Sequence, residues 1–256
     1  MKIVVLIPAY KPQFDSDEEA CVQRYMKVLA QRDIVFVLPE GLDSRWYTKH
    51  FPKAGQRCFP AQYFKNIRGY NRLLLSESFY DAFSEYEYML LAQPDAVIWE
   101  DEDKLDAFAE EGYDYYGAPW EPPRRIWEWT VAPKEGFPGF RIRCCKGKND
   151  GIVMGNGGFS LRHIRHCREL IREFAWRKSY WFWKRNEDIF FGVFGRDSKR
   201  GFKPADPECG RRFAAEYHLK ERVAAGDIPY AVHGWSKDFA DYKDMQDYLH
   251  HYGVEI

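Results

Sequence analysis

The chain has 256 residues, enough for one large α/β domain or two small ones. Its 38 Lys and Arg nearly balance its 39 Asp and Glu, so the net charge gives no reason to expect a nucleic-acid partner. The six cysteines form no C-x-x-C pair, which argues against structural zinc and a disulfide framework. No signal-peptide pattern and no run of 18 apolar residues is present, and we expect a cytoplasmic protein.

The first elements alternate between strand and helix. The run KIVVLIPAY (2–10) predicts a buried parallel strand. Ser16 is expected to form a capping box with Glu19 and to begin a helix that extends to about Arg32. A second strand is predicted at 34–38. This β-α-β order implies a parallel sheet with a right-handed crossover.

The middle of the chain continues the alternation. A helix is predicted for about 69–84, restarted at Ser76, and a strand follows at 88–92. Another helix is expected at 102–111, with Gly112 as its C-cap.

The next segment differs in composition. Residues 121–150 contain four of the 14 prolines, which indicates a long functional loop or a small insertion. After it, GNGGFSLR (155–162) leads into an amphipathic helix expected at about 162–178.

The stretch LLAQPDAVIW places a carboxylate inside an apolar run. Pro94 cannot donate a ladder hydrogen bond, so regular strand pairing should stop there and leave Asp95 at the strand tip. Open α/β sheets bind ligands at the carboxyl ends of their strands, near a switch in strand order. Asp95 could hold a divalent cation there, or it could cap its own backbone as a turn aspartate.

The stretch NEDIFFG contains two adjacent acids, Glu187 and Asp188. Neighbouring carboxylates raise one another's pKa, which suits a general base that works near neutral pH. The alternative is a pair of solvated acids at a helix start, favoured by the helix dipole.

The stretch YAVHGW ends a short apolar strand with His233. A histidine at a strand end can be a metal ligand, and it can also be a packed or capping residue. Other histidines, among them His163 and His166, are expected on surface helices.

The glycines of GNGGFSLR permit close backbone approach to a ligand. The Gly157 and Gly158 amides could therefore meet phosphate or sugar hydroxyl groups. The run is neither a P-loop, since no G-K-[ST] follows, nor a dinucleotide fingerprint.

Taken in chain order, these motifs resemble those of the GT-A glycosyltransferases. They resemble more closely a bacterial family of uncharacterised glycosyltransferase-like proteins. The pairing of GYDYYGAPW with GNGGFSLR is the most specific. The matching stretches span roughly 67–235 and are YNRLLLSESFYDAF, YEYMLLAQPDAVIW, GYDYYGAPW, GNGGFSLR, NEDIFF and VHGW.

The resemblance implies one α/β domain over residues 1–256, with a mixed, mostly parallel sheet flanked by helices. Its Rossmann-like N-terminal half, 1–100, would bind the nucleotide. Residues 101–240 would bind the acceptor and carry the catalytic groups.

The resemblance also implies donor contacts. The end of the first strand, Pro8, Ala9 and Tyr10, would hold the nucleotide base. Further expected donor contacts are Arg68, Asn71, Gln93, Asp95, Gly157, Gly158 and Lys237.

Metal and catalytic roles follow from the same resemblance. Asp95 and His233 would hold Mn²⁺ or Mg²⁺, although Gln93 replaces the first acid of the usual acid-x-acid motif. Asp188 would act as general base, and Glu187 would hold the acceptor.

The implied reaction is inverting transfer of a sugar from a nucleotide-sugar donor, with UDP expected from the fold family. The acceptor would be a saccharide or lipid-linked saccharide in cell-surface polysaccharide synthesis. Eight Lys or Arg within 162–185, beside YWFW, would allow peripheral contact with the inner face of a membrane, or would form a solvated basic face. A non-catalytic carbohydrate-binding module and a metal-dependent phosphohydrolase using Asp95, His233 and Glu187 remain alternatives.

Overall fold

The computed structural model describes residues 1–124, 127–134, 137–144, 152–175 and 186–256. Its strands are β1 (Ile3–Pro8), β2 (Asp33–Pro39), β3 (Gly55–Phe59), β4 (Tyr88–Ala92), β5 (Ala96–Ile98), β6 (Tyr115–Arg124), β7 (Trp127–Lys134), β8 (Phe137–Cys144), β9 (Ile152–His163), β10 (Ala214–Ala215) and β11 (Ala231–His233). Its helices are α1 (Ser16–Val28), α2 (Arg45–His50), α3 (Ile67–Leu74), α4 (Glu77–Asp81), α5 (Leu105–Glu110), α6 (Ile164–Phe174), α8 (Glu187–Phe194), α9 (Pro207–Phe213), α10 (Leu219–Ala224) and α11 (Tyr242–His251), with 3₁₀ turns η1 (Ala61–Phe64), η2 (Gly195–Asp197) and η3 (Trp235–Lys237).

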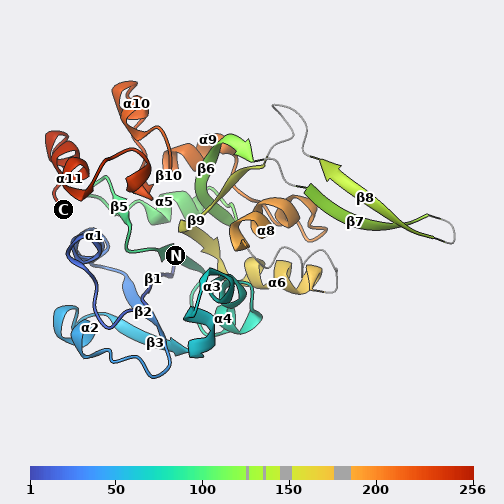
Figure 1. Cartoon of the computed structure of the whole chain (residues 1–256), viewed down its shortest axis with the longest axis horizontal. Coiled ribbons are helices and arrows are strands. Elements are labelled where there is room, and N and C mark those ends of the chain that lie inside the picture. The colour runs from blue at the N-terminus through green and yellow to red at the C-terminus, as the bar shows by residue number, and fades with distance from the viewer. Residues whose placement is uncertain (125–126, 135–136, 145–151, 176–185) are drawn as a thin grey trace.

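Six strands form a mixed, mostly parallel sheet in the order β3-β2-β1-β4-β9-β6 (Figure 1). β1 pairs in parallel with both β2 and β4, whereas β9 runs antiparallel to β4 and β6. From β1 the chain passes to β2 and β3, and it then returns to the other side of β1 as β4. The expected α/β class is confirmed, and the strand order switches between β1 and β4.

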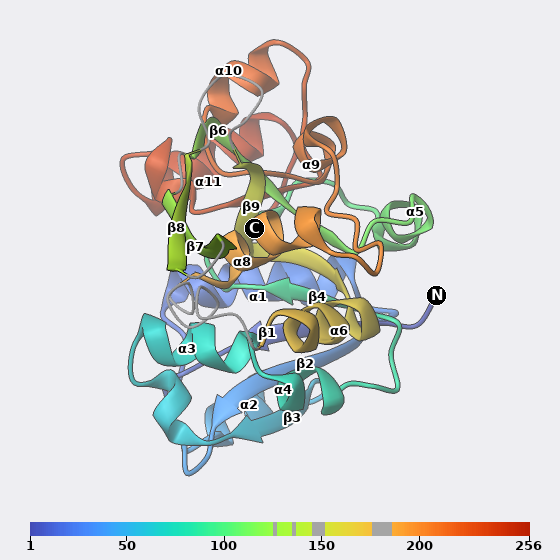
Figure 2. The same cartoon turned by 90° about the vertical axis from the view of Figure 1, so that its right-hand side faces the viewer.

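Helices cover both faces of this sheet (Figure 2). On the face of α1 and α2, Phe14 packs against Phe36 of β2 and against Tyr47 of α2. On the face of α3, α4, α6 and α8, Phe79 of α4 packs against Phe59 of β3. All residues of β1 are buried, as expected of a strand between two helical layers.

A second, small sheet has the order β10-β11-β5. β5 starts only a few residues after β4 and pairs antiparallel with β11, with Ala96 opposite His233. The Gly234 N–H also donates to the Asp95 carbonyl oxygen at 3.3 Å. This pairing brings the tip of β4 and the end of β11 together, although more than 130 residues separate them in the sequence.

Residues 121–150, expected to be a loop or an insertion, include the antiparallel pair β7 and β8, which extends away from the rest of the molecule in Figure 1. Of the basic segment 162–185, the part from 176 onward lies outside the described residues. The membrane contact expected there therefore stays a prediction. None of the helices in the described ranges combines the length and apolar character needed to span a membrane.

Helix α1 begins with a capping box one residue earlier than expected. The Asp15 carboxylate accepts from the Glu18 N–H at 3.0 Å, and Glu18 accepts from the Asp15 N–H at 3.1 Å. The predicted box of Ser16 and Glu19 is therefore wrong. Lys11 pairs with both Asp15 and Glu18, and this ion pair favours the observed register.

We expect Asp15→Ala to lower the free energy of unfolding by about 1 kcal/mol at neutral pH, because α1 loses its cap. The hydrogen bond from the Glu18 backbone lowers the pKa of Asp15. The stabilisation is therefore complete above the unfolded pKa of about 3.9 and is lost as pH falls through the lower folded pKa.

Urea unfolding of wild type and Asp15→Ala at several pH values measures this difference, which should shrink in acid. Asp17→Ala removes a neighbouring first-turn acid that accepts only from Ser16 among the described side-chain bonds, and it should cost less. A difference that persisted unchanged at low pH would contradict the prediction.

Candidate functional site

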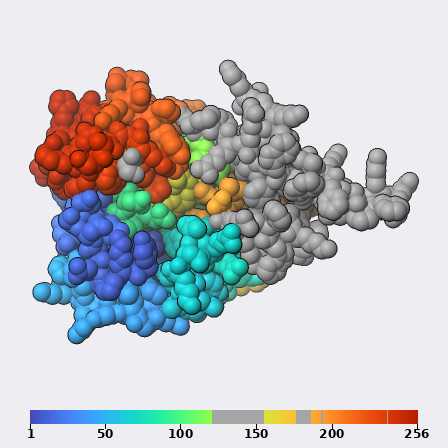
Figure 3. All heavy atoms as spheres, viewed as in Figure 1, coloured from blue at the N-terminus to red at the C-terminus, as the bar shows by residue number. Residues whose placement is uncertain are grey.

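A cleft of about 490 Å³ opens at the carboxyl ends of β1 and β4. It lies where the strand order switches, the position at which open α/β sheets bind ligands. Its walls come from the end of β1, the start of α1, residues 64–67 with Tyr70, and residues 93–95. Figure 3 shows the blue N-terminal, cyan, green and red C-terminal segments meeting on one face, so parts of the chain far apart in sequence form a continuous surface.

Exposed apolar side chains line the cleft. Tyr10 is 61% exposed and Ile67 is 67% exposed. A tyrosine ring in contact with solvent can stack on the face of a nucleobase or a sugar. Of the other expected donor contacts, Pro8 lines the cleft, Arg68 is exposed on α3, and Ala9 is buried in the core.

Three polar atoms meet at the tip of β4. His233 Nε2 lies 3.2 Å from Gln93 Oε1 and 3.5 Å from Asp95 Oδ1. Burial raises the pKa of Asp95, but the hydrogen bond and charge of His233 outweigh burial, and the pKa lies below its ordinary value. The interruption of the apolar run therefore places an ionised carboxylate beside an imidazole, at the edge of the cleft.

These residues fit a divalent cation. Two oxygens and an imidazole nitrogen are donors that Mn²⁺ accepts, and Mg²⁺ accepts the oxygens. Ligands that share one ion through bonds of about 2.1 Å lie roughly 3 Å apart, close to the separations from His233 Nε2. Half of the Asp95 side chain is exposed, so the group can be reached from the cleft.

Lys237 and Glu216 extend this group. The Lys237 ammonium contacts the carboxylate of Glu216, which is buried, and lies 4.5 Å above the ring of Tyr217. The charge of Lys237 also helps to lower the pKa of Asp95. Glu216 follows a strand of two residues, too short to be recognised as a pattern in the sequence, and no role for it was predicted.

The glycines of GNGGFSLR lie in β9 and leave room for side chains. A Cβ on Gly157 would lie 2.1 Å from Glu187 Oε1, and a Cβ on Gly158 would lie 2.0 Å from His233 Nε2. Because consecutive Cα atoms are about 3.8 Å apart, the Glu187 carboxylate and the His233 ring lie within about 11 Å of each other. The Gly158 N–H donates to Asn156 Oδ1 at 2.8 Å. Ligand contact by the two glycine amides stays a prediction.

Glu187 is held by a buried ion pair. Its Oε1 lies 2.8 Å from Arg162 Nη2, and the Arg162 side chain is fully buried. Arg162 also donates to Ser160 Oγ at 2.9 Å and lies over the rings of Tyr115 and Phe191. One oxygen of Glu187 is thus already engaged in anchoring α8 to β9. The expected contact with an acceptor is not tested by this arrangement.

Asn71 holds the same helix from α3. It is buried, and its Oδ1 accepts from the Glu187 N–H at 2.8 Å. Asp188, the next residue of α8, is partly buried, and its Oδ1 accepts from the Ile189 N–H at 2.7 Å. Asn71 therefore has a structural contact with α8. Its expected role as a donor contact and the general-base role of Asp188 both stay predictions.

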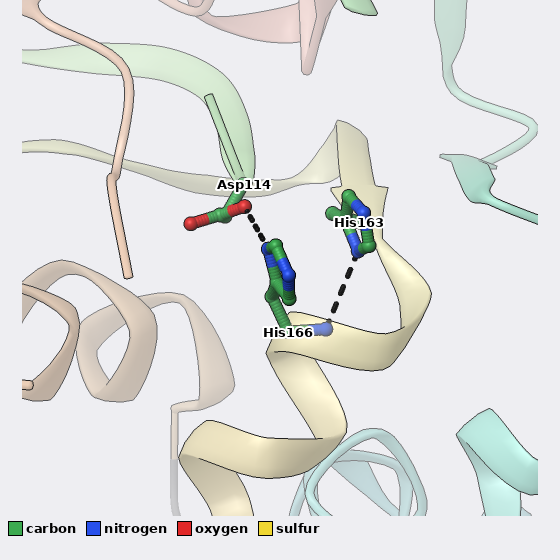
Figure 4. A group of neighbouring side chains, drawn as sticks. All are labelled: Asp114, His163 and His166. Carbon is green, nitrogen blue, oxygen red and sulfur yellow. Dashed lines mark hydrogen bonds and ion pairs between the residues drawn. The ribbon is translucent and has the colours of Figure 1, made fainter. Parts of the chain in front are cut away.

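A second group of potential metal-ligating residues lies around His163, the last residue of β9. Asp114, His163 and His166 each place one ligand atom within 4.8 Å of the others (Figure 4). His166 Nδ1 lies 2.6 Å from Asp114 Oδ1, and the two imidazole rings stack 3.8 Å apart at 7°. Lone pairs lie in the ring planes, so those of parallel stacked rings do not converge on one ion. Asp114, His163 and His166 could hold a metal only if a ring turned.

The family described as "Protein of unknown function (DUF5672)" matches residues 53–233. No curated protein matches the sequence. Among solved structures, the chain is similar to a glycosyltransferase involved in the glycosylation of the major capsid of PBCV-1, with 11% identity, 97% of this chain and 98% of that chain covered, and a TM-score of 0.45. It is also similar to the bifunctional glycosyltransferase WbbM, with 12% identity, 91% of this chain and 45% of that chain covered, and a TM-score of 0.49. Neither likeness is close enough to identify an activity for this chain.

We expect Gly158→Ala to displace His233, because the added methyl group would lie 2.0 Å from its Nε2. Overpacking of this kind costs about 1–3 kcal/mol. Urea unfolding gives the loss of stability, and the imidazole resonances in an NMR spectrum report the moved ring.

Gly55→Ala is the matched control, since its Cβ would meet Val35 Cγ2 at an ordinary 3.4 Å. It should change stability by less than about 0.5 kcal/mol. A Gly158→Ala protein with wild-type stability and unmoved His233 resonances would contradict the close approach of the His233 ring to Gly158.

Proposed function

This chain belongs to the DUF5672 family of proteins of unknown function, and we propose that it is a glycosyltransferase. It would move a sugar from a nucleotide-sugar donor to a saccharide or a lipid-linked saccharide. The observation that carries this proposal is the group of Gln93, Asp95 and His233 at the edge of a cleft in the switch position of the sheet. Such a group suits a cation-bound diphosphate, the part that nucleoside-diphosphate sugars share.

The donor would lie along the cleft. Its base would stack near Tyr10 at the end of β1, and its diphosphate would lie near Asp95. A divalent cation held by Asp95 and His233 supplies positive charge to the diphosphate when it is bound. Lys237, whose charge already acts on Asp95, would add positive charge where the leaving group becomes more negative.

In the transfer step, Asp188 would take the proton of the acceptor hydroxyl as its oxygen attacks the anomeric carbon. The bond between that carbon and the phosphate oxygen breaks, and the nucleoside diphosphate leaves from the opposite face, with inversion. General-base assistance of this kind contributes about 10²–10⁴-fold to the rate. Glu187, held by Arg162, fixes the start of α8 and hence the position of Asp188.

A thermal-shift panel tests donor recognition. Wild-type protein is heated with UDP, GDP, CDP or ADP, each with and without Mn²⁺. We expect one nucleotide to raise Tm, and to raise it more with the metal, because ligand that binds only the folded state stabilises it. Asp95→Asn should remove the effect of the metal.

Two results would contradict the proposal, one from the panel extended to saccharides and one from an assay for released inorganic phosphate. If no nucleotide raised Tm but saccharides did, the cleft would belong to a carbohydrate-binding module. If the protein released inorganic phosphate from the nucleotides, the phosphohydrolase alternative would be favoured.

We expect Asp188→Asn to reduce sugar transfer by about 10²-fold or more while donor binding persists, because the amide cannot take a proton. The variant keeps the shape of the side chain and an oxygen for the Ile189 N–H. Release of nucleoside diphosphate in the presence of acceptor measures turnover. Asp247→Asn, on the exposed face of α11, is the control. Wild-type turnover in Asp188→Asn would exclude this residue as the base.

A further inference from the structure

A tight turn carries two of the three polar groups at the tip of β4. The Ala96 N–H donates to the Gln93 carbonyl oxygen at 3.1 Å and closes a β-turn, with Pro94 at the second position, where proline is favoured. The Gln93 N–H donates to the Gly158 carbonyl oxygen at 2.7 Å and ties the start of the turn to β9. The side chains of Gln93 and Asp95 therefore leave a backbone that is already closed on itself.

Tyr25 of α1 fastens this turn from below. Its hydroxyl oxygen lies 2.8 Å from the Gln93 carbonyl oxygen and 2.5 Å from that of Ala96, so one O–H is shared between acceptors at the two ends of the turn. The residue is fully buried, and its ring packs against Phe159 of β9. In the described part of the chain, this is the hydrogen bond to the turn backbone that comes from a side chain, whereas the others join backbone groups.

The hydroxyl of Tyr25 acts as a donor. Burial raises the pKa of Tyr25, and the neighbouring Cys21 and Asp95 raise it further, so the phenol stays protonated. Both of its acceptors are carbonyl oxygens of the chain itself. Tyr25 therefore acts through the turn and does not itself touch a ligand. A phenylalanine at this position would fill the same space but could not hold the turn.

The candidate cation group depends on where this turn lies. Gln93 Oε1 is 3.2 Å and Asp95 Oδ1 is 3.5 Å from His233 Nε2, and the imidazole comes from a different sheet. Groups that share one ion must be held to within about 0.5 Å of the required geometry. Contacts that orient metal ligands accordingly contribute about 10- to 100-fold to metal affinity. The fit between the turn and the imidazole therefore depends on the contacts that hold the turn backbone.

We propose that Tyr25 is a positioning residue, whose hydroxyl holds the turn so that Gln93 and Asp95 meet a divalent cation together with His233. The inference rests on the proposed function, because the cation is the one that would accompany the donor diphosphate. Tyr25 lies on the buried face of α1, where nothing in the sequence distinguishes it from an aromatic residue of the core.

Tyr25→Phe tests the proposal because it removes only the hydroxyl. Calorimetric titration with UDP and with GDP, each with and without Mn²⁺, gives the factor by which the metal raises nucleotide affinity. We expect this factor to fall about 10-fold, because the cation group loses its support. Affinity without metal should change by less than about 2-fold, since Tyr25 does not line the cleft. The His233 imidazole resonances, recorded without metal or nucleotide, should shift as the turn moves.

Tyr116→Phe is the matched control. Tyr116 is also fully buried, and its hydroxyl donates to the Phe108 carbonyl oxygen and accepts from the Tyr113 N–H at 3.2 Å. Neither partner lines the cleft. We expect a fall in the urea midpoint comparable to that of Tyr25→Phe, with a wild-type effect of Mn²⁺ and unmoved His233 resonances.

The other outcomes would overturn the proposal in distinguishable ways. A wild-type effect of Mn²⁺ in Tyr25→Phe, or unmoved His233 resonances, would refute the positioning role and leave the proposed function intact. An equal loss of the Mn²⁺ effect in Tyr116→Phe would show a general loosening of the fold. Equal losses of affinity with and without metal would show that the hydroxyl supports the nucleotide pocket instead of the cation group. Failure of the wild type to bind any nucleotide would refute both the proposed function and this inference.

Discussion

The close approach of two side chains to Gly157 and Gly158 is the constraint on which the candidate site depends. Glu187 comes from α8 and His233 from β11, and each occupies space that a Cβ on β9 would fill. The two glycines therefore matter because they have no Cβ atom. They allow a helix and a second sheet to meet the central sheet at one point, next to the switch between β1 and β4.

Pairing of opposite charges explains why the charged side chains Arg162, Glu187 and Glu216 can be buried here. Arg162 neutralises Glu187 beside Gly157, and Lys237 neutralises the buried Glu216. A buried charge is tolerated when it is paired and hydrogen-bonded, and it becomes costly when its partner is removed. Asp95 remains half exposed at the cleft, where a ligand can reach it.

Local patterns predicted many of the elements, and their failures have physical causes. Continuous apolar runs predicted β1, β2 and β4, and the cap at Ser76 marked the start of α4, where its Oγ accepts from the Phe79 N–H. No strand was predicted for GNGGFSLR, because glycine weakens a strand pattern, yet pairing with β4 and β6 holds the run in β9. The partner of His166 is Asp114, 52 residues away, and nothing near either residue indicates the pair.

The sequence by itself determined the alternation of strands and helices and placed Asp95 and His233 at strand ends, because periodicity and chain breaks are local properties. The sequence also showed that two acids, Glu187 and Asp188, are adjacent and lead into an apolar run. Only the tertiary structure decided that Arg162 pairs with Glu187 and that Glu216 holds Lys237. These contacts join segments that become neighbours only when the two sheets and α8 pack together.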